Sequence, residues 1–170
     1  MTLATHIVVA GAVASPFLPN PLVGFLAGFL SHYVVDAIPH WDWPLKSIRI
    51  NLQGRKYKTN FSSGTIIFDT MMMLSDMALG FLALFLVLQV NFSINAAVAL
   101  FAAAVGGVLP DGMEFFYHAF RKEPFVTHHR FHSWAHTRRI IPHRETLKGI
   151  FMQLPVVAIP LGFLMFIFFR

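Results

Sequence analysis

The chain has 170 residues, of which 56% are hydrophobic and only 12% are charged, with a formal net charge of +5. A soluble domain carries roughly 25% charged residues, so this composition excludes an ordinary water-exposed surface and indicates a single-domain, all-α, polytopic integral membrane protein. The absence of cysteine excludes disulfides and thiolate metal sites, and nucleic acid is not an expected partner because the basic residues flank apolar segments, as membrane orientation alone would require.

Five apolar segments alternate with polar connectors. The first begins without the basic region and cleavage site of a signal peptide, so we expect it to be retained. Prolines at 19 and 21 separate the first two segments, and Pro155 and Pro160 are expected to kink the last. We therefore expect four or five apolar helices, over about 3–18, 21–38, 65–90, 94–109 and 150–169, with polar loops over 40–63 and 111–148.

The two polar loops bracket an even number of crossings and carry most of the basic residues. Positive-inside bias then places both loops and the N-terminus in the cytoplasm and Arg170 outside, which predicts an integral protein of the plasma (inner) membrane. Helices 3–18 and 94–109 are shorter than the roughly 20 residues that span hydrocarbon, which leaves open whether they cross fully.

This threading gathers all nine histidines and all eight acidic residues at one face. A charge at mid-bilayer costs about 2.5–3.5 kcal/mol on insertion scales, so polar groups in membrane helices usually have a functional reason. Imidazoles and carboxylates are metal ligands. The sequence therefore predicts a polar His/Asp cluster that binds a divalent metal, with zinc as the expected ion, at the cytoplasmic interface.

The strongest local motif runs from Ser31 to Asp42. His32 and Asp36 are one helical turn apart on the same face, and Pro39 ends the helix so that His40 can fold back toward them. The pair can share one ion or two adjacent ions. The alternative is a hydrogen-bonded His–Asp pair that caps the helix end.

Two further motifs carry ligand types. Asp111 follows Leu109 and Pro110, and either starts a helix as its N-cap or ligates a metal; Glu114 and His118 would follow it on one stripe. The second motif holds His128, His132 and His136, which recur at every fourth residue and would align on a helix. The alternative for that segment is a solvated stretch in the headgroup region.

These motifs together resemble the membrane-bound metal-dependent hydrolases, a family akin to the zinc-dependent phospholipase C group. The resemblance rests on Thr5-His6, on Leu109-Pro110-Asp111, on His128 to Ser133, and on Gly28-Phe29-Leu30-Ser31-His32 through Asp36. It implies a metal-dependent hydrolase reaction and gives no substrate.

We therefore expect a hydrolase that acts on a phosphoester or another ester, with a lipid as one candidate substrate, through a metal-activated water. The expected metal ligands are His6, His32, Asp36, Asp111, His132, His128 and His40. Asp69 and Glu114 are candidate acid–base or orienting carboxylates, and Arg130, Arg138 and Arg139 are candidate phosphate-binding residues.

Two other classes stay open at this stage. A non-enzymatic divalent-metal-binding or transport protein would use the same ligands, and a transporter would place ionisable groups such as Asp76 near mid-membrane. A structural membrane protein whose histidines respond to pH would bind no metal.

Overall fold

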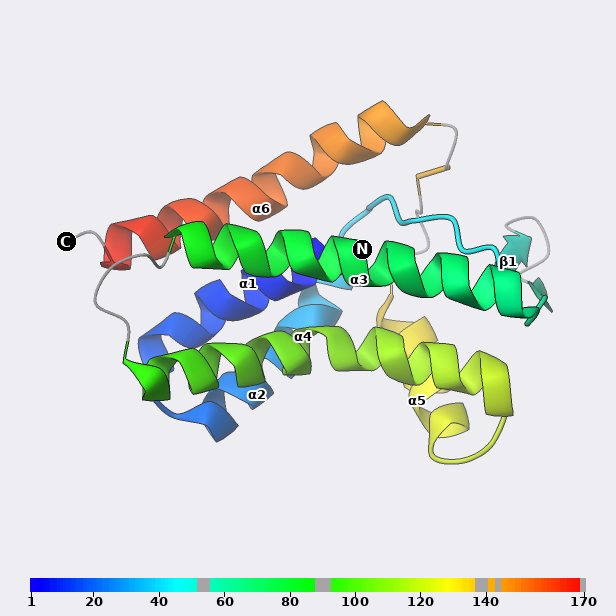
Figure 1. Ribbon diagram of the computed structural model, residues 1–170, viewed down its shortest axis with the longest axis horizontal. Coiled ribbons are helices and arrows are strands. Elements are labelled where there is room, and N and C mark those ends of the chain that lie inside the picture. Colours follow the sequence, from blue (N-terminus) through cyan, green and yellow to red (C-terminus); the bar gives the residue numbers. More distant parts are fainter. Residues whose placement is uncertain (52–55, 88–92, 137–140, 143–144, 169–170) are drawn as a thin grey trace.

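The computed structural model describes residues 1–51, 56–87, 93–136, 141–142 and 145–168, and it is almost entirely helical (Figure 1). The expected all-helical fold is confirmed, with one short antiparallel hairpin added in the first polar connector. The elements are α1 (Leu3–Ala14), a 3₁₀ turn η1 (Ser15–Phe17), α2 (Pro21–Asp36), β1 (Ile48–Asn51), β2 (Lys56–Thr59), α3 (Ser63–Val87), α4 (Ile94–Phe120), α5 (Phe125–Ala135) and α6 (Thr146–Phe168).

Three helices of the described chain, α3, α4 and α6, are long and apolar enough to cross a membrane. The helices α1 and α2 are apolar but shorter, at 12 and 16 residues. The pattern is that of a membrane protein with three candidate spans. Four or five complete crossings stay a prediction.

Helix α1 lies at the centre of the bundle and packs against α2, α3, α4 and α6. Almost every one of its side chains is buried, including Ile7 and Ala10, which are fully inaccessible. A helix that is apolar on all sides requires such a position. Protein therefore surrounds α1, and its short length matches its place inside the bundle.

The closest packing in the molecule is between α2 and α4. A Cβ atom added to Gly28 would collide with the carbonyl oxygen of Ala103, and one added to Gly106 would collide with that of Phe25. Small residues are the usual way for membrane helices to approach this closely. The seam fixes the register of α2 on α4 and brings their polar ends together.

The second half of α4 differs from the sequence-based boundaries. We expected a helix that ends at Leu109 with Asp111 as a possible N-cap, but α4 continues through Pro110 to Phe120. A proline inside a helix lacks an N–H, and its ring crowds the backbone carbonyl of the residue four positions earlier, which here is Gly106. The expected loop 111–148 thus contains nearly three turns of helix at its start, residues 111–120 of α4, and α5 after it.

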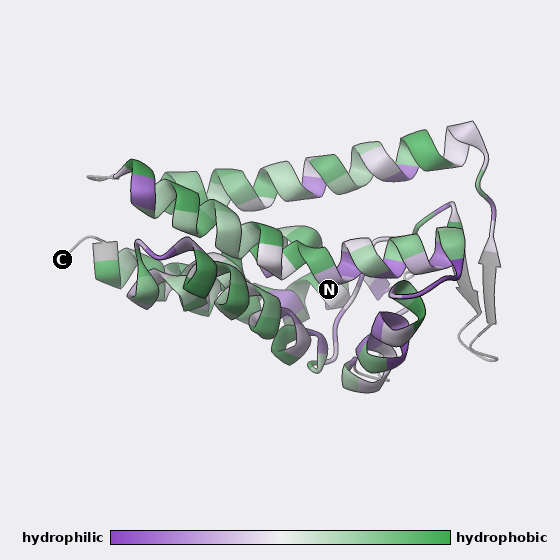
Figure 2. Cartoon of the chain, turned by 90° about the horizontal axis from the view of Figure 1, so that it is seen from below, coloured by the Kyte–Doolittle hydropathy of each residue, from purple (hydrophilic) through white to green (hydrophobic). Residues whose placement is uncertain are grey.

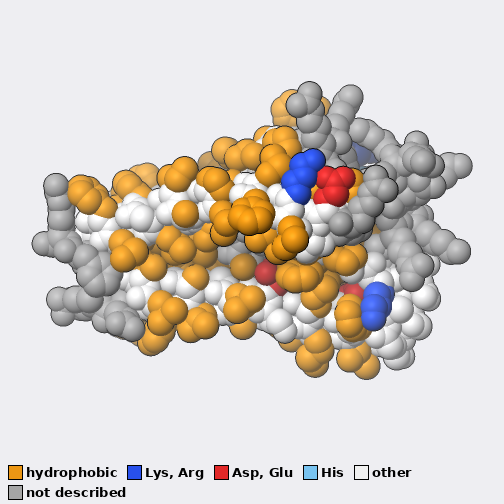
Figure 3. Space-filling view, turned by 90° about the horizontal axis from the view of Figure 1, so that it is seen from above, with side chains coloured by type: hydrophobic (Ala, Val, Ile, Leu, Met, Phe, Trp, Pro, Cys, Tyr) orange, Lys and Arg blue, Asp and Glu red, His pale blue; other side chains and the backbone are white. Residues whose placement is uncertain are grey.

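Polar and apolar residues are segregated along the long axis. Hydrophilic residues gather mainly around α5 and the helix ends near it (Figure 2). In the space-filling view, hydrophobic side chains cover most of the described surface, and the visible Lys, Arg, Asp and Glu side chains lie toward the same end (Figure 3). The start of α1 and the end of α2 meet α4 at the boundary between the two regions.

Candidate metal centre

The end of α2 presents His32 and Asp36 to α4, and both side chains are buried, at 0% and 1% exposed. The Nδ1 atom of His32 lies 2.9 Å from the carbonyl oxygen of Gly107, and its Nε2 atom lies 3.2 Å from Oδ2 of Asp36. A carbonyl oxygen only accepts, so Nδ1 carries the proton. The Nε2 lone pair therefore points toward Asp36.

Asp111 lies one helical turn after Gly107 on α4. Its Oδ1 atom is 3.8 Å from His32 Nε2, and its side chain is 23% exposed. It is the most accessible member of the group formed with His32, Asp36 and His132. Any small molecule that reaches the group arrives beside Asp111.

Helix α5 supplies His132. Its Nε2 atom lies 3.1 Å from His32 Nε2, 3.4 Å from Asp36 Oδ2 and 3.9 Å from Asp111 Oδ1. The side chain is 7% exposed. Four side chains from three helices therefore point their donor atoms at one position.

The spacing of these donors matches a small metal ion. Zinc binds nitrogen and oxygen at about 2.0–2.1 Å in tetrahedral geometry, which separates the ligand atoms by about 3.3–3.4 Å. Five of the six separations run from 3.1 to 3.9 Å, and one donor atom from each of His32, Asp36, Asp111 and His132 lies within 4.8 Å of all the others.

His32 Nε2 and His132 Nε2 form a hydrogen bond at 3.1 Å, which needs a proton on one of them, but the other contacts among the four donors have no such proton assigned. His32 uses its proton on Gly107, and Asp36 Oδ2 is a buried atom without a hydrogen bond. One imidazolium proton would satisfy a single contact and leave the others as facing lone pairs. Buried acceptors that face one another are costly. A cation at the common position would satisfy all four.

His6 of α1 lies on the other side of the two carboxylates. Its Nε2 atom is 3.2 Å from Asp36 Oδ1 and 3.8 Å from Asp111 Oδ2, and its ring stacks on that of His32 at 4.1 Å. Both ring nitrogens are buried and lack a hydrogen bond. Gly107 permits this approach, because a Cβ atom there would lie 3.1 Å from the His6 carbonyl oxygen and 2.8 Å from Ala10 Cβ.

His40 folds back from the connector after α2. Its Nδ1 atom donates to the carbonyl oxygen of Ile38 at 2.8 Å, and its buried Nε2 atom lies 3.8 Å from Asp36 Oδ1 without a hydrogen-bond partner. Burial lowers the pKa of His40 to about 3, and the nearby amino group of Met1 acts in the same direction. The imidazole is therefore neutral at ordinary pH, the form that binds metals.

Other residues singled out by the sequence lie outside the four-donor group. His128 Nε2 lies 3.2 Å from the Tyr33 hydroxyl, and burial lowers the pKa of His128. Arg130 is exposed on α5, two residues from His132 and so about 200° around the helix from it. Arg138 and Arg139 lie outside the described residues.

Two residues named in the sequence motifs have partners that the sequence did not specify. His136, directly after α5, places Nε2 3.7 Å from Asp36 Oδ2. Its signal was its spacing of four from His132. Glu114, one turn beyond Asp111 on α4, accepts from His129 Nδ1 at 2.7 Å and lies 3.7 Å from His132 Nδ1, so it contacts a ligand and lies behind it. No local pattern indicated this pairing.

The carboxylates of α3 have structural partners. Asp69 accepts hydrogen bonds from the backbone N–H groups of Lys46 and Ser47 at 2.9 and 2.7 Å, and also from the Ser47 hydroxyl. Asp76 accepts from the backbone N–H of Ala4 at 3.2 Å, in the first turn of α1, where N–H groups have no helical partner. Asp69 therefore anchors the connector and Asp76 the start of α1.

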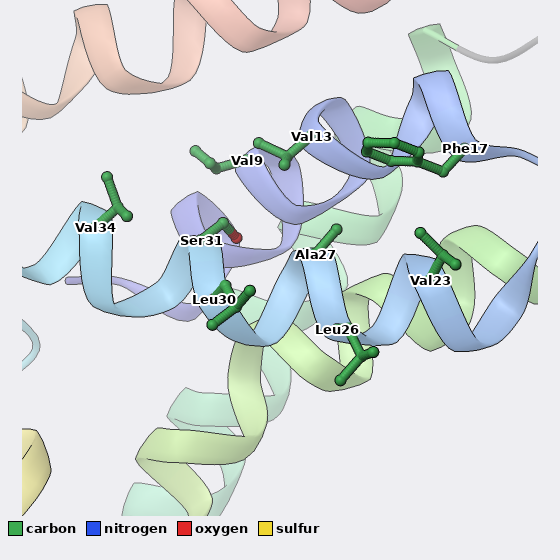
Figure 4. A pocket seen from close by; sticks show the side chains of 9 residues that line it. All are labelled: Val9, Val13, Phe17, Val23, Leu26, Ala27, Leu30, Ser31 and Val34. Atoms are coloured by element: carbon green, nitrogen blue, oxygen red, sulfur yellow. The ribbon is translucent and has the colours of Figure 1, made fainter.

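An apolar groove of about 480 Å³ lies between α1 and α2 (Figure 4). Ser31 is its only polar lining residue, and its hydroxyl donates to the Gly28 carbonyl oxygen at 2.8 Å. Leu30 and Val34 line the groove at two positions on either side of His32, so they lie on the opposite side of α2 from that ring. The groove is a separate, lipid-compatible surface.

Comparisons with known proteins add no relative: no family model, no curated protein and no solved structure matches this chain. The chemical identity of the site thus depends on its own geometry.

Proposed function

We propose that this chain is a membrane-bound, metal-dependent hydrolase that cleaves a phosphoester or another ester, with zinc as the resident ion. The convergence of His32, Asp36, Asp111 and His132 carries the proposal, because their donors are spaced for one ion and the buried Asp36 Oδ2 has no hydrogen bond. All four belong to the motifs on which the resemblance to metal-dependent hydrolases rests.

The donor set fits zinc or a similar borderline divalent ion. Imidazole and carboxylate ligands together, without thiolate, suit such ions. The Nδ1 atom of His32 faces the Gly107 carbonyl oxygen and that of His132 faces the Glu114 carboxylate, an arrangement that is usual for histidines that bind a metal. When bound, the ion supplies Lewis acidity, which polarises an ester oxygen and lowers the pKa of a water molecule.

The residues around that position have distinct tasks. His32 and His132 hold fixed ring orientations through Gly107 and Glu114, respectively. Asp111 borders the accessible side, so it is the carboxylate best placed to accept a proton from an incoming water. The seam of α2 and α4 keeps these groups in register without relying on flexible loops.

The depth of the site suits a substrate at a membrane surface. Asp111 comes 17 residues after Ile94, or about 25 Å along α4, close to the roughly 30 Å thickness of the hydrocarbon core. We propose that the site faces the cytoplasm at the inner membrane. Since the chain has no cysteine, a single cysteine at Trp134, which is 79% exposed, would report sidedness by labelling with a membrane-impermeant maleimide.

The decisive experiment measures metal content and hydrolysis on the same preparation. Purified full-length protein should contain metal and hydrolyse at least one of bis(p-nitrophenyl) phosphate, p-nitrophenyl phosphate and p-nitrophenyl acetate, with chelation abolishing turnover. Asp111→Asn should lose activity, whereas Glu123→Gln, at an exposed carboxylate before α5, should retain it. Metal-free protein with unchanged turnover would refute the proposal.

The alternative class is a metal-binding or transport protein. Bound metal with no turnover of any ester would favour it. The position of Asp76 gives transport no support, since this carboxylate is 5% exposed and bonded to the start of α1.

A further inference from the structure

A second group of donors adjoins the first and shares one residue with it. Asp36, His40 and His136 each place a donor atom within 4.8 Å of the other two. We propose that the centre binds two ions, with Asp36 as the shared carboxylate and His40 and His136 as ligands of the second. The inference rests on the proposed function, because it adds an ion to the same centre.

The geometry around Asp36 has two sides. His32 and His132 approach its Oδ2 atom at 3.2 and 3.4 Å, while His40 lies 3.8 Å from Oδ1 and His136 lies 3.7 Å from Oδ2. These longer separations leave space for an ion between carboxylate and imidazole. With His6 at 3.2 Å from Oδ1, five histidines lie near Asp36, and His40 and His136 are the two that form the second group with it.

The surroundings of His40 give independent evidence that it binds an ion. Its side chain is 0% exposed, its Nδ1 proton is used on Ile38, and its Nε2 atom has no hydrogen-bond partner. A buried nitrogen lone pair without a partner is costly. An ion held with Asp36 would remove that cost.

The backbone fixes both rings in place. The backbone N–H of Ile141 donates to the His40 carbonyl oxygen at 2.8 Å, and that of His136 donates to the His132 carbonyl oxygen at 2.8 Å. The rings of His40 and His136 are in edge contact at 4.8 Å. Because His132 and His136 are one turn apart, the α5 segment supplies one imidazole to each ion.

The amino group of Met1 competes with the second ion for Asp36. The amino group of Met1 donates to Asp36 Oδ1 at 2.8 Å and lies 3.6 Å from Asp42 Oδ2. This oxygen already faces a positive charge, so a second ion must move the amino group aside. We expect tight binding of the first ion and weaker binding of the second.

The test counts ions and looks for their interaction. Full-length protein is loaded with Mn²⁺, and metal content is measured by mass spectrometry alongside electron paramagnetic resonance. The wild type should hold two ions per chain with a spin-coupled spectrum, and His136→Ala should hold one ion with an uncoupled spectrum. Glu123→Gln is the control, because this exposed carboxylate just before α5 belongs to neither group.

The outcomes separate this inference from the proposed function. One ion in a wild type that still hydrolyses an ester overturns the second site alone, as do two ions retained in His136→Ala. No bound ion and no metal-dependent turnover overturn both. If His136→Ala does not purify as a single species, His136→Gln and the wild-type stoichiometry give the same decision.

Discussion

Asp36 and Asp69 are carboxylates of equal burial, each 1% exposed, but their surroundings are opposite. Asp69, on α3, accepts from two backbone N–H groups and one hydroxyl. Asp36, at the end of α2, is surrounded by imidazoles, and its Oδ2 atom has no hydrogen bond. Equal burial of the same chemical group thus serves two different purposes.

The two carboxylates differ in which groups lie around their oxygen atoms. The N–H and O–H donors around Asp69 satisfy its charge without any external ligand, so this carboxylate stabilises the fold. At Asp36 the neighbouring ring nitrogens His32 Nε2 and His40 Nε2 carry lone pairs, since their other nitrogens hold the protons. The amino group of Met1 donates to Asp36 Oδ1, and a metal ion would supply the positive partner that Oδ2 lacks.

The strongest test of this difference is the same substitution, Asp to Asn, at Asp36 and at Asp69. Asp36→Asn should abolish metal binding and hydrolysis, because it removes the charge shared by the donor groups. The metal-free variant should also unfold at a lower temperature than metal-free wild type, since the buried amino group of Met1 loses the carboxylate to which it donates. Metal content, turnover and thermal unfolding in detergent check all three. Retained metal would show that Asp36 is not a ligand.

Asp69→Asn should lower stability but leave metal binding intact. Its amide N–H₂ would face the backbone N–H of Lys46 or Ser47, donor against donor, at a cost of about 2–3 kcal/mol in unfolding free energy. The protein that remains folded should still bind metal. Denaturant unfolding and metal content measure the two effects, and unchanged stability would contradict the anchoring role.

The sequence predicted the all-helical class, most of the helices and part of the cluster. Apolar runs bounded by proline predicted the helices, and the spacing of His32 and Asp36 predicted a shared face, because these are local properties of the chain. The all-helical class is confirmed. Asn20 caps α2 by accepting from the N–H groups of Leu22 and Val23, and Pro21 follows it at the first helical position.

The remaining features depend on contacts between distant segments. The extension of α4 past Pro110 follows from its glycine-lined contact with α2, and local proline rules predict the opposite. The anchoring of residues 46–47 by Asp69 joins a connector to a helix, and the approach of Glu114 to His132 joins α4 to α5. These contacts join residues that are far apart in the chain, so no regular spacing in the sequence indicates them.

The seam that aligns the cluster can be tested with glycine substitutions. Gly28→Ala would push a methyl group onto the Ala103 carbonyl oxygen, so we expect a loss of about 1–3 kcal/mol and weaker metal binding, since His32 is one turn away. Gly112→Ala, on α4 beside Asp111, meets nothing within 4 Å and should gain up to about 1 kcal/mol from helix propensity. Equal behaviour of the two variants would refute the seam.

The smallest expected effect concerns Glu114. Its carboxylate faces Nδ1 of His132, as the Gly107 carbonyl oxygen faces Nδ1 of His32. Its Oε1 atom is held by His129 at 2.7 Å and lies 3.2 Å from His118 Nε2, and its Oε2 atom lies 3.7 Å from His132 Nδ1. Glu114→Gln keeps the shape but removes the charge that orients the ring. Outer carboxylates of this kind are worth about 10–100-fold in metal affinity, and the 3.7 Å separation favours the lower end. We expect about a tenfold weaker affinity with an unchanged unfolding temperature, measured by competition with a chromogenic chelator. Since a purely structural Glu114 would lower stability and leave the affinity of the folded protein intact, the two readouts distinguish the roles.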